Sequence, residues 1–140
     1  MNNKPGTFED LDEAAPLEYD DVYVKARIEE AAETLKRLPR QGMSQKMTTW
    51  PDVVISTFEM RGWGNEKARL GPPSAKAITR MDECLEWLMP LNGTNRRLVW
   101  ARACKIPWRR LEDADGRSAV TLRKHHQYAL EAMANRLNQL

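Results

Sequence analysis

The chain has 140 residues, of which 41% are hydrophobic and 30% charged, with five tryptophans and a formal net charge of +2. A chain of this length is expected to form one domain, and this apolar and aromatic content excludes a wholly disordered protein. The small net charge by itself says nothing about nucleic acid, so the distribution of the charges has to be considered.

Charge is unevenly distributed along the chain. Residues 1–33 contain ten acids and three bases, a net charge of −7, whereas residues 96–140 contain ten Lys or Arg and four acids, a net charge of +6. This asymmetry is typical of a basic binding region with an acidic tail. Charges that simply cover the solvated faces of helices would give the same totals, and this reading stays open.

The sequence also bears on the cellular setting. Cys84 and Cys104 lie within helical patterns and show no CxxC spacing, which argues against a disulfide framework and a zinc site. A reducing, cytoplasmic compartment is therefore expected. No run approaches the ~20 apolar residues of a membrane span, and no apolar segment follows a positive region at the N-terminus, so neither a membrane anchor nor a secretory signal is expected.

The N-terminal part of the chain predicts a tail and one helix. Residues 1–18 combine many acids with proline, glycine and few large apolar groups, and are predicted to be a disordered acidic tail. Helical order is expected to begin at Asp20 or Asp21, either of which can cap a helix. An apolar stripe at steps of three and four then predicts an amphipathic helix that Pro39 ends. The stripe consists of Val24, Ile28, Ala31, Leu35 and Leu38.

The next segment predicts a second helix between two loops. The polar residues 40–48 predict a loop, after which Thr49 is expected to cap a helix that stops at Gly62. The inward-facing residues of this helix are predicted to be Val53, Val54 and Phe58. Residues 61–74 are rich in glycine and proline and form a loop longer than most in compact domains. Its Trp63 is interpreted as a plug of the core, with an exposed stacking surface as the alternative.

Two further helices are predicted in the middle of the chain. The third helix is expected to start at a Ser74 cap and to be closed by Pro90 and the Asn-Gly pair that follows. Its apolar residues repeat at helical spacing and indicate a core helix. They are Ile78, Met81, Leu85 and Leu88, with Ala77, Cys84 and Trp87 widening the face. Thr94 is expected to cap a fourth helix that ends near residue 105.

The C-terminal part predicts a short helix followed by a long one. Pro107 begins the short helix, in which Trp108 and Leu111 are expected to point inwards. The Asp-Gly pair that follows is a turn signal, and Ser118 is expected to cap a last helix reaching about residue 138. The buried stripe of this helix is predicted to consist of Leu122, Ala129, Leu130, Met133, Ala134 and Leu137.

No catalytic or cofactor-binding constellation is found in the sequence. Glycine-rich phosphate loops and HExxH are absent, and the only histidines, His125 and His126, point about 100° apart on one helix. They are interpreted as flanking or partly packed residues. The acids Asp82, Glu83 and Glu86 of the third helix are interpreted as solvent-facing. We therefore expect a protein that is not an enzyme and that uses no cofactor and no metal.

The predicted elements define an all-α fold of five to six helices, with an N-terminal helical bundle followed by a C-terminal helix-turn-helix. No stretch alternates apolar and polar residues as a strand would, the nearest being residues 53–57. Within one compact domain, residues 1–18 are the expected tail. Residues 19–93 are a supporting or oligomerisation region, and residues 94–140 are the helix-turn-helix region.

The segment 95–138 resembles the C-terminal helix-turn-helix of sigma factors and their relatives. The resemblance lies in a short helix WRRLEDA, a turn DG and a second helix that begins RSAVTLRKHH. The matching residues are Gly116, Ser118, Thr121, Leu122, Arg123, Lys124, Ala129 and Leu130. Relatives usually have small or aliphatic residues in the short helix, whereas this chain has a tryptophan, two arginines and acids that would repel phosphate. The whole chain is also similar to an uncharacterised family of small helical proteins found in phages and proteobacteria.

The resemblance implies that the last helix enters the major groove of DNA, with its N-terminal residues at the base edges. Arg and Lys pair with guanine, Gln pairs with adenine, and a Thr methyl suits the thymine methyl group. The candidates are Arg117, Ser118, Thr121, Arg123, Lys124 and Gln127. Free amides near Arg117 and Ser118 also suit a phosphate. Contacts to the DNA backbone are expected from Arg96, Arg97, Arg102, Lys105, Arg109 and Arg110.

The leading hypothesis is a DNA-binding helix-turn-helix protein, phage-associated or a bacterial transcription regulator, whose partner is double-stranded DNA. A small terminase subunit, which combines DNA reading with ring assembly, is one subtype and would be a homo-oligomer. The alternative is a helical protein-interaction module without DNA binding, whose partner is RNA polymerase or another protein. The acidic tail is expected to compete for the basic surface or to bind a partner.

Overall fold

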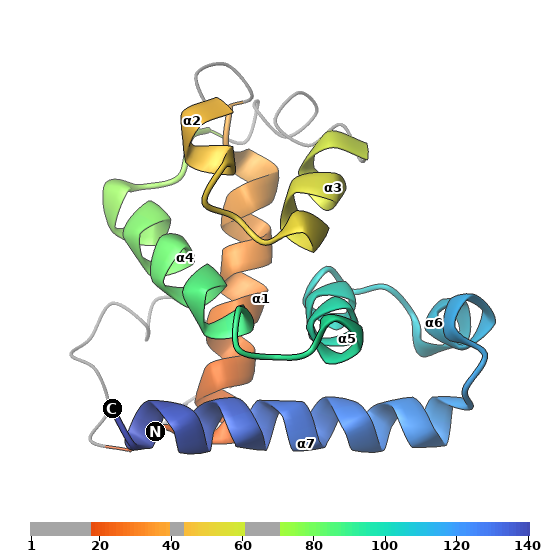
Figure 1. The fold of residues 1–140 in the computed structure, drawn as a ribbon. Coiled ribbons are helices and arrows are strands. Elements are labelled where there is room, and N and C mark those ends of the chain that lie inside the picture. The colour runs from red at the N-terminus through yellow and green to blue at the C-terminus, as the bar shows by residue number, and fades with distance from the viewer. Residues whose placement is uncertain (1–17, 40–43, 61–70) are drawn as a thin grey trace, which may run out of the picture.

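The computed structural model describes residues 18–39, 44–60 and 71–140, and within these ranges it contains seven α-helices and no strand (Figure 1). The prediction of an all-α fold is confirmed, whereas the predicted number of five to six helices is wrong. The predicted tail up to residue 17 and the tryptophan at position 63 lie outside the described residues. None of the helices in these ranges has the length and apolar content needed to cross a membrane.

Helices α1 (Asp21–Arg37) and α4 (Ala75–Leu88) form the most extensive helix–helix contact in the described chain. The side chains of Asp20 and Ser74 cap them, each accepting a hydrogen bond from the amide three residues later, at 2.8 and 3.1 Å. The predicted stripe of α1 is buried throughout, as are three of the four predicted stripe residues of α4. Because each fully buried aliphatic side chain contributes roughly 1.5–3 kcal/mol, these stripes hold the pair together.

Two arginine–carboxylate pairs add polar contacts between α1 and α4. Arg80 binds the buried Glu30 through Nε and Nη2, with Nε 3.0 Å from Oε1. Arg27, which is 4% exposed, donates to Glu83 Oε1 at 2.7 Å, and its guanidinium lies 4.6 Å from the centroid of the Trp87 ring. Glu83 is exposed, as interpreted from the sequence, but it also neutralises a buried cation, which is costly to leave unpaired.

Helix α2 (Ser44–Met47) is the helix that the sequence does not predict. It lies in the polar segment 40–48, and a four-residue helix is too short to produce an apolar period. Thr49 does not cap the following helix, because that helix begins three residues later at Asp52; the Thr49 hydroxyl donates to the carbonyl of Lys46 at 2.8 Å. Helix α3 begins later than predicted and covers Asp52–Met60. Residues 53–57, whose sequence comes nearest to a strand pattern, are therefore helical.

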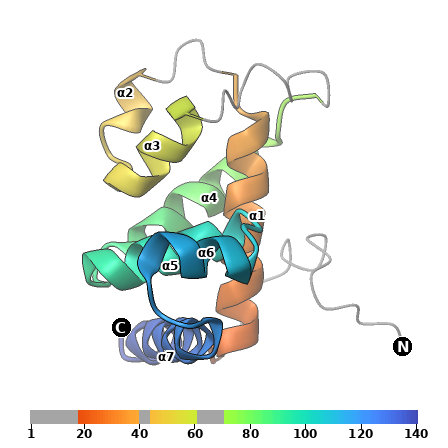
Figure 2. The same ribbon diagram turned by 90° about the vertical axis from the view of Figure 1, so that its right-hand side faces the viewer.

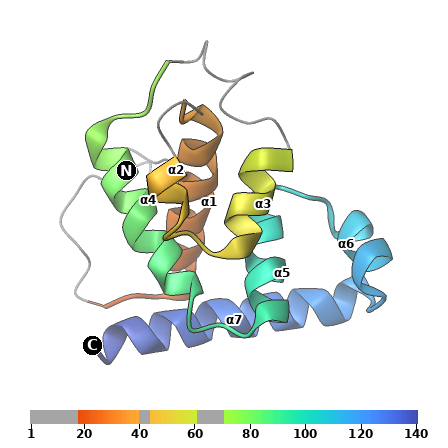
Figure 3. The same cartoon turned by 45° about the horizontal axis from the view of Figure 1, so that its top comes forward.

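Helix α5 (Gly93–Ala103) also begins earlier than expected. Its N-cap is Asn92 rather than Thr94, and the Asn92 side chain accepts a hydrogen bond from an amide of the first turn at 2.8 Å. Asparagine is at least as good a cap as threonine, so the Asn-Gly pair ends one loop and starts the helix. The buried Trp100 donates through Nε1 to Thr57 Oγ1 at 3.0 Å, which joins α5 to α3 (Figure 3).

Helix α7 (Ala119–Asn138) runs beneath α1 and α5 (Figure 1). Its predicted stripe is buried except for the last leucine, which is half-buried. Asn138 exchanges two hydrogen bonds with the main chain of Tyr19, at 2.7 and 2.9 Å, and so ties the end of α7 to the residues ahead of α1. A single core cluster contains residues from both 19–93 and 94–140, so the two predicted regions share one core.

The link between α5 and α6 (Trp108–Asp115) contains Lys105, whose φ is 65°. The Ile106 amide donates to the carbonyl of Ala101 at 3.1 Å, in the six-to-one pattern that ends many helices on a left-handed residue. Glycine is the usual residue there, because a Cβ in the left-handed region costs roughly 1–2 kcal/mol. The chain therefore carries backbone strain at this position.

We predict that Lys105→Gly raises the free energy of unfolding by about 0.5–1 kcal/mol, since the relief of strain exceeds the extra chain entropy of glycine. Urea denaturation measures the change. Lys105→Ala is the matched control, because it removes the same charge but keeps the Cβ, and it is expected to give no gain. An equal gain in both variants would attribute the effect to the charge and contradict the prediction.

Candidate nucleic-acid interface

Helices α6 and α7 are joined by a three-residue turn, residues 116–118. Gly116 has a left-handed φ of 93°, and its amide donates to the carbonyl of Glu112 at 2.8 Å, which ends α6. Ser118 caps α7 as predicted, with its Oγ accepting a hydrogen bond from the Thr121 amide at 3.2 Å. Glycine takes this φ without strain, so the Asp-Gly turn and the serine cap are both confirmed.

Helix α6 lies across the first turns of α7, since the view along α7 in Figure 2 shows α6 from the side. None of its residues is buried; Trp108 and Leu111, which were predicted to point inwards, are half-buried. The centroid of the Trp108 ring lies 4.4 Å from Arg102 Cζ, 5.5 Å from Arg123 Cζ and 5.6 Å from the centroid of the His126 ring. We refer to these four residues as the Trp108 cluster. A cation over an aromatic ring contributes roughly 0.5–2 kcal/mol, so the cluster fixes α6 against α5 and α7.

Carboxylates from α6 occupy the amides at the start of α7. Glu112 Oε2 accepts a hydrogen bond from the Ala119 amide at 2.7 Å, and Asp115 Oδ1 accepts one from the Arg117 amide at 3.2 Å. A helix start attracts negative charge, and here two side chains of the same chain supply it. The amides of Arg117 and Ala119 are therefore already occupied by carboxylates of the same chain.

Five of the predicted DNA contacts have side-chain donors engaged within the chain. Arg102 Nη1 donates to the carbonyl of Ile106 at 2.6 Å, and Ser118 Oγ donates to Thr121 Oγ1 at 3.1 Å. Arg117 forms a two-pronged ion pair with Asp115, at 2.6 and 2.9 Å, which lowers the pKa of this carboxyl below its ordinary value. Arg96 donates to main-chain carbonyls at the end of α4, one of them at 2.9 Å. Gln127 Nε2 donates to Asp21 Oδ2 at 2.7 Å. The partner of Gln127 lies 106 positions away in the sequence, so no local pattern indicates it.

Most of the predicted contacts nevertheless lie at the surface. Exposed residues are Arg97, Lys105, Arg109, Arg110, Ser118, Arg123 and Lys124, while Arg102 and Thr121 are half-buried. Arg109 and Arg110 directly follow Trp108 on α6, Arg123 lies against its ring, and Lys124 directly follows Arg123 on α7. We call these four residues the basic edge. None of them forms an ion pair with another described residue.

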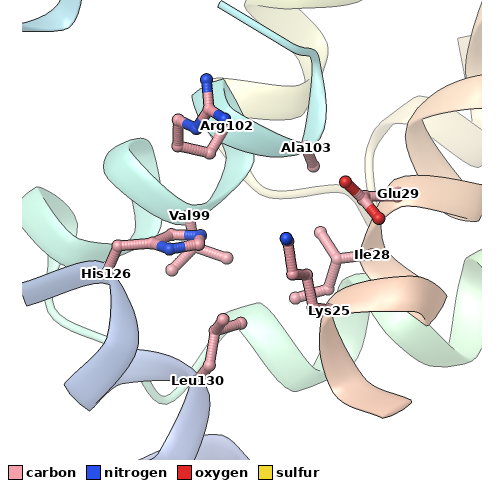
Figure 4. A pocket seen from close by; sticks show the side chains of 8 residues that line it. All are labelled: Lys25, Ile28, Glu29, Val99, Arg102, Ala103, His126 and Leu130. Atoms are coloured by element: carbon pink, nitrogen blue, oxygen red, sulfur yellow. The ribbon is translucent and has the colours of Figure 1, made fainter. Parts of the chain in front are cut away.

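Beside the Trp108 cluster, helices α1, α5 and α7 surround a hollow of about 20 Å³, which we call the notch (Figure 4). It is lined by Lys25, Ile28, Glu29, Val99, Arg102, Ala103, His126 and Leu130. Lys25 and Glu29 belong to α1, and the sequence analysis missed them because no C-terminal pattern includes them. Burial and then the charges of Arg102 and Lys25 lower the pKa of the His126 imidazole from 6.5 to about 4.

A larger groove of about 440 Å³ lies between α3, α5, α6 and the start of α7. Its lining is largely apolar and includes Val53, Leu98, Ile106 and Leu111. Arg97, one of the predicted DNA contacts, also lines it. The groove therefore offers an apolar surface next to a cation.

The described residues contain no group of three or more His, Cys, Asp and Glu side chains that could hold a metal ion. Both cysteines are buried and free of disulfides. Burial raises the pKa of the Cys84 thiol to about 12, so the reactive thiolate is a minor form of this side chain. The basic edge and the notch are thus the charged features from which a function can be argued.

Comparison with known proteins identifies the family. Residues 36–133 match the model of the Domain of unknown function (DUF6362), and since the match covers most of the chain, the protein belongs to this family. The matched region extends from the end of α1 into α7 and includes α6 and the turn. No curated protein and no solved structure matches the chain. The function therefore has to be argued from the site.

We predict that His126 makes the protein less stable as the pH falls from 6.5 to 4. The imidazole has a lower pKa in the folded chain than in the unfolded chain, so the unfolded state binds the proton first. The stability is full above pH 6.5, and about 3 kcal/mol is lost once the pH passes below 4. Urea unfolding of wild type and His126→Phe from pH 4 to 7.5 measures the loss. Between these pH values His126→Phe is expected to lose about 3 kcal/mol less free energy of unfolding than wild type. Equal losses in the variant and in wild type would contradict the prediction.

Proposed function

We propose that this protein binds double-stranded DNA, with α6, the turn 116–118 and α7 acting as a helix-turn-helix. In that motif a short helix and a capped longer helix are joined by a tight turn, and the second helix enters the major groove. The order of short helix, glycine turn, serine cap and long helix supports this assignment, as does the position of α6 across the start of α7 (Figure 2). The resemblance of this segment to the C-terminal helix-turn-helix of sigma factors supports it as well.

The observation that carries the proposal is the charge on the N-terminal half of α7. Leu122 and His126 are buried and fix the packed side of this half, which leaves Arg123 and Lys124 exposed. Cations in this position of a recognition helix pair with guanine edges or with phosphates. Thr121, half-buried one turn from the helix start, is placed to add a methyl contact to a base.

The acids of α6 oppose DNA binding less than the sequence suggests. The Glu112 carboxylate is bonded to an amide of α7, and the Asp115 carboxylate is paired with Arg117. Both charges are thus partly neutralised by groups of the same chain, and only Asp113 of the three acids forms no hydrogen bond or ion pair with a described residue. The exposed Arg109 and Arg110 precede it on the same helix and supply two opposite charges.

Within this proposal the protein is a phage-associated or bacterial regulator of transcription. Helices α1 to α5 provide the core on which α6 and α7 are mounted, because α7 packs on α1 and α5 along its length. The cations of the basic edge contact the phosphates, and Thr121 contacts a base. A rigid mount of this kind keeps the reading side chains in register with the groove.

A helical protein-interaction module is the second candidate function. The groove of about 440 Å³ between α3, α5, α6 and α7 favours it, because apolar grooves between helices accept apolar side chains of a partner. In this case the cations of the basic edge would be solvated or would face acids of the partner. The two candidates differ in whether the protein binds duplex DNA.

We predict that fluorescence anisotropy detects binding of labelled duplex DNA at low salt, and that the affinity falls as salt rises. The slope of log K against log salt is expected to be about −0.9 for each phosphate contacted. The double variant Arg123→Ala, Lys124→Ala is expected to bind at least about tenfold more weakly, with a slope reduced by about 2.

The matched control is the double variant Lys76→Ala, Arg136→Ala. It removes two positive charges at exposed positions in the first turn of α4 and the last turn of α7, away from the basic edge. Its affinity is expected to stay close to that of wild type. Wild type without detectable duplex binding even at low salt would rule out the proposal and favour the protein-interaction module. If both double variants lose the same amount of duplex affinity, the DNA-binding site does not lie at the start of α7.

A further inference from the structure

The notch between α1, α5 and α7 gathers more positive than negative charge. Lys25 and Arg102 line it together with Glu29, and Arg123 lies against the same Trp108 ring as Arg102. Glu29 is the one carboxylate among the residues that line the notch, which also include two cations. In Figure 4 the Lys25 ammonium and the His126 ring point towards the middle of the hollow, with Glu29 at its side.

His126 offers a hydrogen-bond donor that no described residue uses. It is 8% exposed, and its ring packs edge-on against the Trp108 ring without a hydrogen bond to a described residue. A neutral imidazole has one N–H to donate, and the His126 nitrogens are not among the fully buried unpaired atoms, so they remain reachable from solvent. The hollow beside the ring has about 20 Å³ and opens to solvent, so it has room for an oxygen atom of a group that lies at its mouth.

We propose that the notch is a phosphate site, in which one phosphate oxygen enters the hollow against Lys25 and His126 while Arg102 and Arg123 flank the group. The phosphate is held by the ammonium charge of Lys25, by the N–H of the neutral imidazole and by the positive potential of the two guanidinium groups. Because the imidazole stays neutral, it donates without adding to the repulsion among the cations.

We assign the phosphate to the DNA backbone beside the recognition helix, and this assignment rests on the proposed function. His126 and Arg123 are residues of the N-terminal half of α7, so the notch flanks the part of the helix that would enter the groove. Lys25 then makes α1 part of the DNA contact, although α1 precedes the helix-turn-helix by about seventy residues. Glu29 repels an anion, so free phosphate is expected to bind weakly and the duplex to bind through its additional contacts.

The first experiment uses inorganic phosphate alone. The full-length protein is titrated at constant ionic strength with chloride as the balancing anion, and NMR follows the ring signals of His126 and the Nε signal of Arg102. Saturable shifts are expected in wild type and in Lys76→Ala, and their loss is expected in Lys25→Ala. Both lysines are exposed and both variants remove one charge from a helix, so Lys76→Ala controls for the change in net charge. NMR shifts that change linearly with phosphate concentration, or that are equal in Lys25→Ala and Lys76→Ala, would contradict the proposal that free phosphate binds at the notch.

The second experiment measures duplex binding against salt for the same variants. Lys25→Ala is expected to weaken binding about three- to tenfold for every duplex sequence, and to reduce the salt slope by about 1, as the loss of one phosphate contact requires. If Lys25→Ala has the same duplex affinity and salt slope as Lys76→Ala, Lys25 does not contact the DNA backbone. This result would contradict the phosphate site but not the proposed function. If wild type binds no duplex, the proposed function fails. Saturable shifts that depend on Lys25 would then support a site for a free phosphate only.

Discussion

The indole ring of Trp108 holds α6 in place, and the arrangement of α6 and α7 depends on this contact. No residue of α6 is buried, so the helix cannot be positioned by an apolar stripe of its own. Arg102 of α5 and Arg123 of α7 lie against the ring, and His126 meets its edge. Arg102 and His126 also line the notch, so the contacts that hold Trp108 also place a positive charge beside the notch.

Much of the fold could be predicted from periodic apolar residues and from caps. The stripe of α1, the cap at Ser74, the glycine turn at Gly116 and the cap at Ser118 are all found where the sequence places them. These features are local, since a stripe repeats within one helix and a cap bonds to an amide three residues away. Helix α2 was missed because four residues carry no period, and Asn92 was missed as a cap because its Asn-Gly pair also indicates a turn.

The candidate site was predictable only where its geometry is local. The exposure of Arg123 and Lys124 follows from the buried stripe of α7, and the structure places both residues at the surface. No sequence pattern indicates that Arg96 is bonded to carbonyls at the end of α4 or that Gln127 is bonded to α1, since these contacts depend on how the helices are packed. Lys25 was missed for the same reason, because its place beside His126 results from the crossing of α1 and α7.

The sequence by itself determined the helical class, most of the helix boundaries and the turn between α6 and α7, because hydrogen bonds within three or four residues and apolar periodicity decide these features. The tertiary structure alone decided which cations remain available to a ligand. Charge is a property of each residue, but availability depends on the acids and carbonyls that packing brings within hydrogen-bond distance. Packing thus engaged Arg96 within the fold, left Lys124 in solvent, and added Lys25 from the opposite end of the chain.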